Sequence, residues 1–324
     1  MRLKTAIIFT WLIASYLSAL LLAQTWWQAG LCCVSIGLAM AAIGFNVQHD
    51  GGHRAYATKR WQNALAAASL DFIGASSYVW SYKHNVFHHS NPNCVGLDPD
   101  IDLQPLCRLA PTQASHPWQR FQHAYIWFLY AFLAVKWLFD DFRDIYLGTV
   151  GGRYFPRPKG GQLLQLCVGK LFFVSWSIVL PLLLHPAMNV ALSWAVGSVT
   201  ISLALATVFQ MAHVVERAGF TTPATEKTPW AEHQVATTAN FAPGAPLLTW
   251  LVGGLNHQIE HHLFPSVCHM QLPALAPIVK ATCEEFGVPY LVYPTAGAAL
   301  AAHLRWLRAM GAPAVQSASS GETT

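Results

Sequence analysis

Four long apolar stretches dominate the hydropathy pattern of this chain, at about residues 5–23, 30–48, 163–184 and 189–212. A helix needs about 20 apolar residues to cross the hydrocarbon of a bilayer, and each stretch comes close to that length. A short turn with Trp26 and Trp27 joins the first pair, and a turn around His185 and Pro186 joins the second. Tryptophan is enriched at membrane interfaces. The pattern therefore predicts an all-α integral membrane protein with four transmembrane helices in two hairpins.

The segments outside these stretches are more polar. Residues 121–139 are apolar but include His123 and Lys136. We interpret them as a helix lying in the membrane interface, because a fifth crossing would separate the histidine-rich segments onto opposite faces. Residues 1–315 are expected to form one membrane domain, with a helical cap over the spans. The Ser- and Thr-containing tail, 316–324, is expected to be disordered.

The distribution of basic residues predicts the orientation. The chain has 19 Lys and Arg residues, and the two short turns contain none of them. The positive-inside rule then places the opposite face, both termini and the cap in the cytoplasm. The first span begins directly after Arg2 and Lys4, with no small-residue cleavage site before a polar start, so we expect it to be retained as a signal anchor. The expected location is a bacterial inner membrane.

Composition excludes several classes of protein. Hydrophobic residues make up 54% of the chain and charged residues 10%, whereas charged residues form roughly a quarter of an ordinary soluble domain. The seven cysteines are an odd set without a Cys-x-x-Cys pair, so they predict neither a disulfide framework nor a zinc site. No nucleic-acid partner is expected.

Histidines are gathered in three clusters near the ends of the predicted spans. Adjacent histidines are poor core residues, because each buried ring needs hydrogen-bond partners. With four crossings, all three clusters and the histidine at the end of the fourth span share one membrane face. Neutral imidazole suits Zn, Cu, Fe and Ni, and so many ring nitrogens predict two metal ions. The residues are His49, His53, His84, His88, His89, His213, His257, His261 and His262.

These motifs resemble those of membrane fatty acid desaturases, the superfamily with three histidine boxes. The boxes here are His49-x-x-x-His53, His84-x-x-x-His88-His89 and Gln258-x-x-His261-His262. The stretches Trp80–Asn85, Trp230–Phe241 and Gly253–Asn256 are similar as well, and the likeness extends from about residue 40 to 290. Glutamine at the start of the third box resembles the front-end branch, the Δ5/Δ6-type, linoleoyl-CoA-desaturase-like enzymes.

The resemblance implies a set of metal ligands for two non-haem iron ions. They are His49, His53, His84, His88, His89, His213, His261 and His262. Gln258 occupies the remaining ligand position, and whether it binds directly or through water stays open, as does ligation by His257. His233, Asp50 and Asn240 are further candidates for ligands or their supports. Carboxylates that accept the free ring N–H groups are expected among Asp98, Asp100, Asp102 and Glu260.

The implied activity is O2-dependent desaturation, which introduces a cis double bond into an acyl chain carried by CoA or by a lipid. Electrons are expected from a separate ferredoxin or cytochrome b5 with its reductase, because the chain lacks the His-Pro-Gly-Gly motif of a fused cytochrome b5 domain. One alternative is a lipid or alkane hydroxylase or ketolase on the same scaffold. A non-catalytic metal-binding membrane protein is a weaker alternative, since Lys170 is the only charged residue placed inside the four spans.

Overall fold

The computed structural model describes residues 1–224 and 228–312. Within them, four helical rods are long and apolar enough to cross a membrane, which confirms the number of predicted spans. The second rod ends later than expected and includes His49. The tail predicted to be disordered, 316–324, lies outside the described residues. The rods are Arg2–Leu22, Trp26–Gly52, Gly161–Leu184 and Ala187–His213.

Three of the rods contain a stretch of wider π-type turns. Such insertions are rare and often mark functional sites. The first rod consists of α1 (Arg2–Leu17) and η1 (Ser18–Leu22); the second of α2 (Trp26–Ala42), η2 (Ile43–Gln48) and α3 (His49–Gly52); the third of α9 (Gly161–Val174), η6 (Ser175–Val179) and α10 (Leu180–Leu184). The fourth is the single helix α11 (Ala187–His213).

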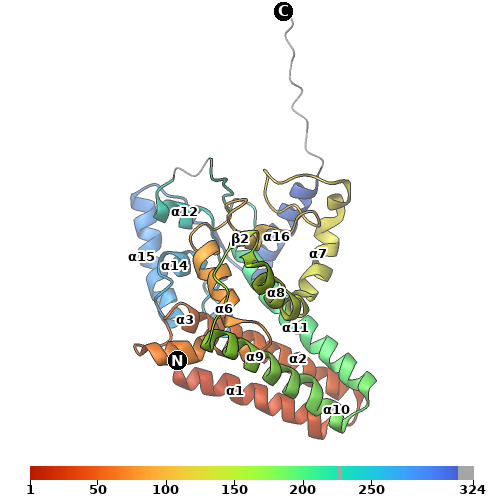
Figure 1. Cartoon of the computed structure of the whole chain (residues 1–324). Coiled ribbons are helices and arrows are strands. Elements are labelled where there is room, and N and C mark those ends of the chain that lie inside the picture. The colour runs from red at the N-terminus through yellow and green to blue at the C-terminus, as the bar shows by residue number, and fades with distance from the viewer. Residues whose placement is uncertain (225–227, 313–324) are drawn as a thin grey trace, which may run out of the picture.

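The second and fourth rods form the centre of the membrane part, and they pack closely enough that a side chain at Gly37 would meet the carbonyl oxygen of Gly197 at 2.7 Å. Next to this crossing, Met40, Ile43 and Ile201 belong to the largest buried apolar cluster. In Figure 1 the rods lie at the bottom, and the shorter helices are gathered above them. The residues at the ends of these two rods, near Gly52 and His213, are therefore held by closely packed helices.

The shorter elements follow the spans in chain order. After the second rod come α4 (Arg60–Ala67), α5 (Ser69–Phe72), α6 (Ser77–Trp80), η3 (Ser81–His88), η4 (Pro99–Ile101), η5 (Pro117–Phe121), α7 (Gln122–Ala131), α8 (Leu133–Leu147) and the antiparallel strands β1 (Thr149–Val150) and β2 (Arg153–Tyr154). After α11 come α12 (Trp230–Ala236), β3 (Asn240–Phe241), α13 (Pro246–Leu251), α14 (Gln258–Leu263), η7 (His269–Gln271), α15 (Leu272–Glu285), β4 (Val292–Tyr293) and α16 (Ala296–Gly311), with β3 and β4 parallel.

The helix expected over 121–139 is divided in two. The α-helical path is interrupted at Phe132, and α8 then continues to Leu147, eight residues beyond the expected end. The extension was missed because its acidic residues are turned inward: Asp141 is buried and pairs with Lys170 of the third rod at 2.5 Å. The apolar side chains of Phe139 and Tyr146 are exposed instead. Lys170 thus has a carboxylate partner supplied by a neighbouring helix.

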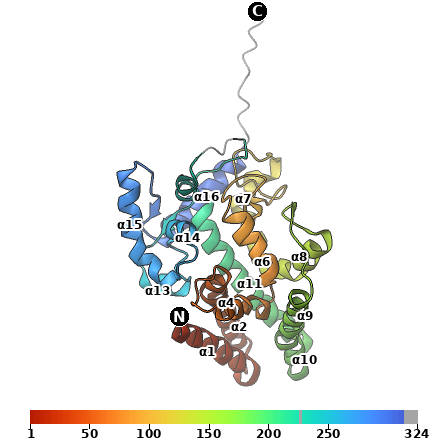
Figure 2. The same ribbon diagram turned by 60° about the vertical axis from the view of Figure 1, so that its left-hand side comes forward.

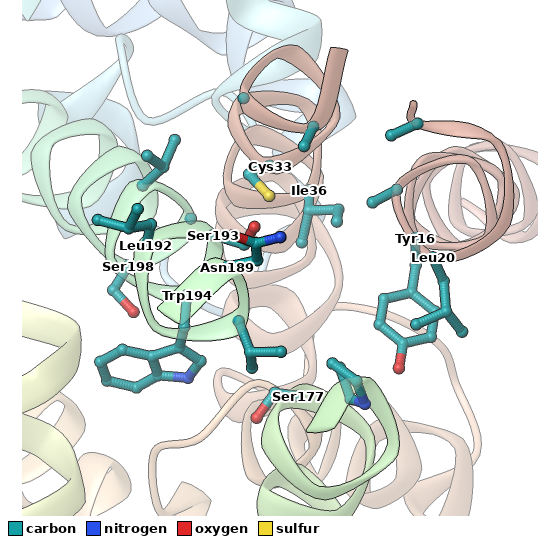
Figure 3. A pocket seen from close by; sticks show the side chains of 18 of the residues that line it. Tyr16, Leu20, Cys33, Ile36, Ser177, Asn189, Leu192, Ser193, Trp194 and Ser198 are labelled. Atoms are coloured by element: carbon teal, nitrogen blue, oxygen red, sulfur yellow. The ribbon is translucent and has the colours of Figure 1, made fainter. Parts of the chain in front are cut away.

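A cavity of about 500 Å³ lies between the rods. Figure 3 shows Tyr16 and Leu20 of the first rod, Cys33 and Ile36 of the second, and Asn189 and Ser193 of the fourth around it. Its lining includes Thr25 and His185 from the two short turns, so it opens at the end of the rods away from His49. Met40 and Ile201 are also part of its lining, and most of its wall is apolar.

Candidate metal centre

Eight histidines from separate parts of the chain converge where the central rods end. The second rod contributes His49 and the residue just after its end, His53; η3 and the residue after it contribute the middle box; α11 and α14 contribute the rest. Every one of the eight is at most 9% exposed. They are His49, His53, His84, His88, His89, His213, His261 and His262.

Two glycines allow the first pair to sit in this cluster. A side chain at Gly51 would lie 2.3 Å from the backbone nitrogen of Ala67, and one at Gly52 would lie 2.3 Å from the ring of Trp80. The end of the second rod can therefore approach α4 and α6 only because both positions lack a Cβ. That approach brings His49 beside His84, with ring centroids 5.1 Å apart.

The second box lies on a π-helix rather than on an ordinary α-helix. Residues 81–88 form a π-helix, and the amide of His89 donates to the carbonyl of His84 at 2.9 Å. A π turn is wider than the 3.6 residues of an α turn, so residues five apart lie one above the other. His84 and His89 are therefore neighbours in the cluster, with their Nε2 atoms 3.1 Å apart.

The ring nitrogens form two neighbouring groups. Nε2 of His84 lies 3.2 Å from Nε2 of His49, and Nε2 of His89 lies 3.1 Å from Nε2 of His261. Within each group the candidate ligand atoms lie within 4.8 Å of one another. The first group is His49, His53, His84 and His261; the second is His88, His213 and His262; and His89 joins His261 and His262 in a set between them.

Several of these nitrogens have no hydrogen-bond partner among the described residues. They are Nε2 of His53, His88 and His262 and Nδ1 of His213. Because buried polar atoms almost always have a hydrogen-bond partner, these nitrogens are candidates for binding a ligand. Burial, reinforced by the neighbouring imidazoles, holds the pKa of His53, His84, His89, His261 and His262 well below the ordinary 6.5. Neutral rings with inward, unpartnered nitrogens fit a pair of metal ions.

Asp98 and Gln234 orient two of the rings. Nδ1 of His88 lies 3.0 Å from a carboxylate oxygen of Asp98, as the sequence suggested. Burial alone lowers the pKa of His88, but this carboxylate outweighs it and raises the pKa overall. Nδ1 of His262 donates to Oε1 of Gln234 at 2.8 Å, while the amide nitrogen of Gln234 donates to the carbonyl of His89 at 3.1 Å. Both contacts leave Nε2 facing the cluster.

Gln234 was missed in the sequence, although it lies inside the quoted stretch Trp230–Phe241. It is fully buried and hydrogen-bonded to two boxes at once. The only local signal was a glutamine next to His233 in an apolar segment, which does not by itself reveal a partner 28 residues away.

Other expected supports occupy different places. Asp50 pairs with His269 at 2.9 Å rather than with a box histidine, and Lys4 completes that chain at 2.9 Å from the other ring nitrogen of His269. His233 lies 3.0 Å from the carbonyl of Pro92.

Asn240 supports the third box from behind. Its amide donates to Glu260 at 2.8 Å, and its oxygen accepts from the amide of Ile259 at 2.9 Å. Tyr290 donates to the same carboxylate at 2.6 Å. These bonds fix α14 and hence the direction of His261. Burial raises the pKa of Glu260 despite these donors.

Gln258 and His257 differ in position. Nε2 of Gln258 lies 2.8 Å from Nε2 of His213, which places its amide at the second group. His257 is buried, and neither of its ring nitrogens has a hydrogen bond among the described residues, although Nδ1 lies 3.9 Å from a carboxylate oxygen of Glu260. It belongs to none of the metal-ligand groups of the described residues. His116, His123, His185 and His303 also belong to none of these groups, while His269 groups with Asp50 and Cys268 outside the eight.

Sequence comparisons with known proteins give the family of this chain. The model of the family described as fatty acid desaturase matches residues 24–294. The chain is 37% identical to the sn-1 linoleoyl-lipid 6-desaturase of Arthrospira platensis, over 96% of this chain and 85% of that protein. It is 39% identical to the protein of the same description from Synechocystis, over 96% and 88% of the two chains. An acyl-lipid (8-3)-desaturase of Physcomitrium patens is 37% identical over 96% of this chain and 66% of its own length.

Proposed function

The chain belongs to the fatty acid desaturase family and is a fatty acyl desaturase, and from that premise we propose that it acts on acyl chains esterified in membrane lipids, at a front-end position. The resemblance drawn from the histidine boxes is thereby confirmed. The relatives named for linoleoyl-lipid 6-desaturation support the lipid carrier and the position near the carboxyl end. Gln258 at the start of the third box supports the same branch.

The observation that carries the proposal is the convergence of eight buried histidines with inward nitrogens. We infer that they hold two iron ions, one among the first group and one among the second, with His89 between them. Iron at this place would supply the activation of dioxygen that removal of hydrogen from an unactivated methylene requires.

The protein's own residues would orient the histidine rings and keep water out of the site. Asp98 and Gln234 hold the outer ring nitrogens of His88 and His262, so that each ring keeps one orientation. Burial of all eight rings excludes water from the place where the acyl chain must lie. Holding reacting groups in the correct orientation can remove a large part of the activation free energy of a reaction.

The cavity between the rods is the place we propose for the methyl end of the acyl chain. Its lining includes Met40, which lies nine residues before His49 in the second rod. At 1.5 Å per residue this is roughly 14 Å along the axis. Apolar chains bind in apolar, largely pre-formed cavities of this size. A chain running along the second rod from the histidines would reach it.

We also propose that the histidine side faces the cytoplasm and that a separate ferredoxin or cytochrome b5 supplies electrons. The absence of Lys and Arg from the turns at Thr25 and His185 supports the orientation.

The test is production of new unsaturated lipids in a host that expresses the chain, is fed linoleate and stearate, and co-expresses a ferredoxin or cytochrome b5 with its reductase. Mass spectrometry would locate the new double bond and the lipid class that carries it, and purified enzyme would be given linoleoyl lipid and linoleoyl-CoA in parallel. We expect a new double bond on the carboxyl side of the existing ones, formed on lipid.

Variants of the histidine cluster test the site. His88→Ala and His261→Ala should abolish the new double bond and lower bound iron, while His116→Ala, outside the cluster, should not. A hydroxylated product, or equal activity in the His88 variant, would overturn the proposal.

A further inference from the structure

A second hollow lies at the histidine side of the spans, away from the metal centre. We call it the interfacial groove. It has a volume of about 400 Å³ and is lined by the start of α1, the end of the second rod, and α4. Figure 2 shows α1 and α4 side by side near the N-terminus. Its wall includes Arg2, Phe9, Tyr56, Trp61, Leu65 and Phe72.

The position of the groove along the membrane normal follows from the spans. Arg2 is the first residue of the first rod, and Val47 lies one turn before the end of the second. The groove is therefore at the level where helices leave the hydrocarbon, and its side chains divide accordingly. Phe9, Leu65 and Phe72 are apolar, whereas Tyr56 and Arg2 bring polar groups.

Three basic residues line or adjoin the groove: Arg2 is part of its wall, and Lys59 and Arg60 directly precede the wall residues Trp61 and Gln62 in the chain. Arg2, Lys59 and Arg60 are exposed, and none forms an ion pair with a carboxylate in residues 1–224 or 228–312. The nearby Asp50 and Asp71 are buried and turned inward, to His269 and to Ser77 respectively. Lys136, Arg143 and Arg305 are also exposed, but each of these three has a carboxylate partner.

We propose that the interfacial groove binds an acidic glycerophospholipid of the leaflet on the histidine side. The three basic side chains would hold its phosphate and headgroup, since basic pockets beside spans recognise acidic headgroups. One acyl chain would lie against Phe9, Trp61 and Leu65. An apolar groove with basic residues in and beside its wall matches an acidic lipid better than a neutral one.

This lipid is bound as a support and not as substrate. Gly51 packs directly against Ala66 and Ala67 of α4, so α4 stands between the groove and His49. Occupancy would press α4 against the end of the second rod and stabilise the segment that carries His49 and His53. The inference needs only that the rods are in a membrane, and it stands independently of the acyl position that the enzyme modifies.

The experiment measures lipid binding to the purified full chain by native mass spectrometry, with phosphatidylglycerol and phosphatidylcholine of identical acyl chains as probes. We expect phosphatidylglycerol to bind at least about tenfold more tightly, and the triple variant Arg2→Gln, Lys59→Gln, Arg60→Gln to lose that preference. The matched control is Lys136→Gln, Arg143→Gln, Arg305→Gln, which removes the same net charge from ion-paired positions and should keep it.

A single substitution in the wall of the groove tests the proposal even if the triple variant does not fold. Gln62→Glu places a negative charge in the groove and should weaken phosphatidylglycerol binding while leaving phosphatidylcholine unaffected. Equal binding of the two lipids, or equal loss in the groove and control triples, would overturn the proposal. Because the readout is lipid binding, its failure is distinguishable from failure of the proposed desaturation.

Discussion

The first and second spans have closely similar apolar character but opposite surroundings. In the first rod 6% of the most hydrophobic window is buried inside the protein, whereas in the second rod the share is 67%. Ile7, Ile13 and Leu17 of the first rod are exposed, and therefore face lipid. In the second rod Asn46 is fully buried, with its amide bonded to the carbonyl of Leu251 at 2.9 Å.

The difference teaches that hydropathy identifies a span without telling what the span does. A bilayer accepts an apolar helix on every side, so lipid contact and burial demand the same residue types in most of the length. What distinguishes the second rod is its C-terminal half, where all of residues 39–51, including Gln48 and His49, are buried in protein. Substitutions should therefore be costly at that end and nearly silent on the first rod.

The largest expected effect is at His49. His49→Ala should reduce desaturation more than about a hundredfold and lower bound iron, because it removes a ring from the first histidine group. Ile13→Ala, on the lipid-facing side of the first rod, should leave both nearly unchanged. Product analysis and metal determination on the two purified variants check this. Loss of activity in both variants would show that the first rod is as sensitive to substitution as the second.

The next effect tests a support from outside the spans. Gln234→Leu removes the acceptor of the Nδ1 proton of His262, and we expect iron affinity and activity to fall by about 10–100-fold. Gln234→Glu retains an acceptor and should recover part of the affinity. Iron titration with Mössbauer spectra of the two variants is the measurement. Identical spectra and affinity in wild type and Gln234→Leu would show that the contact does not orient the ring.

A smaller effect separates the two ends of the second rod itself. Gly51→Ala introduces a methyl group 2.3 Å from the backbone of α4 and should destabilise the protein by about 1–3 kcal/mol, whereas Gly30→Ala meets no atom within 4 Å. Thermal unfolding in a fixed detergent compares them. Equal stability of the two variants would mean that α4 yields without cost.

The smallest expected effect concerns the cavity. Ala134→Phe adds bulk at its wall, and we expect conversion of longer acyl chains to fall several-fold relative to shorter ones. Competition between chains of different length in one assay measures the ratio. An unchanged ratio with full activity would place the methyl end elsewhere.

Much of the architecture could be predicted from the sequence because its signals are local. The four apolar runs give the spans, and the spacing of histidines in three boxes gives the family. The break at Phe132 and the extension of α8 to Leu147 could not be predicted, because Asp141 in that helix is stabilised by Lys170 from another rod. The partner of Asp50 could not be predicted either. Asp50 was expected to support the metal ligands because it follows His49 in the chain, but it binds His269, 219 residues away.

The sequence by itself determined the membrane character, the histidine set and the desaturase family, since apolar length and box spacing are properties of short segments. The tertiary structure alone decided how those histidines face one another. The π-helix that aligns His84 with His89, the bond from His262 to Gln234, and the approach of α4 permitted by Gly51 each depend on contacts between distant segments. Ring nitrogens acquire a direction only when packing fixes both the backbone path and the acceptor on the far side of the ring.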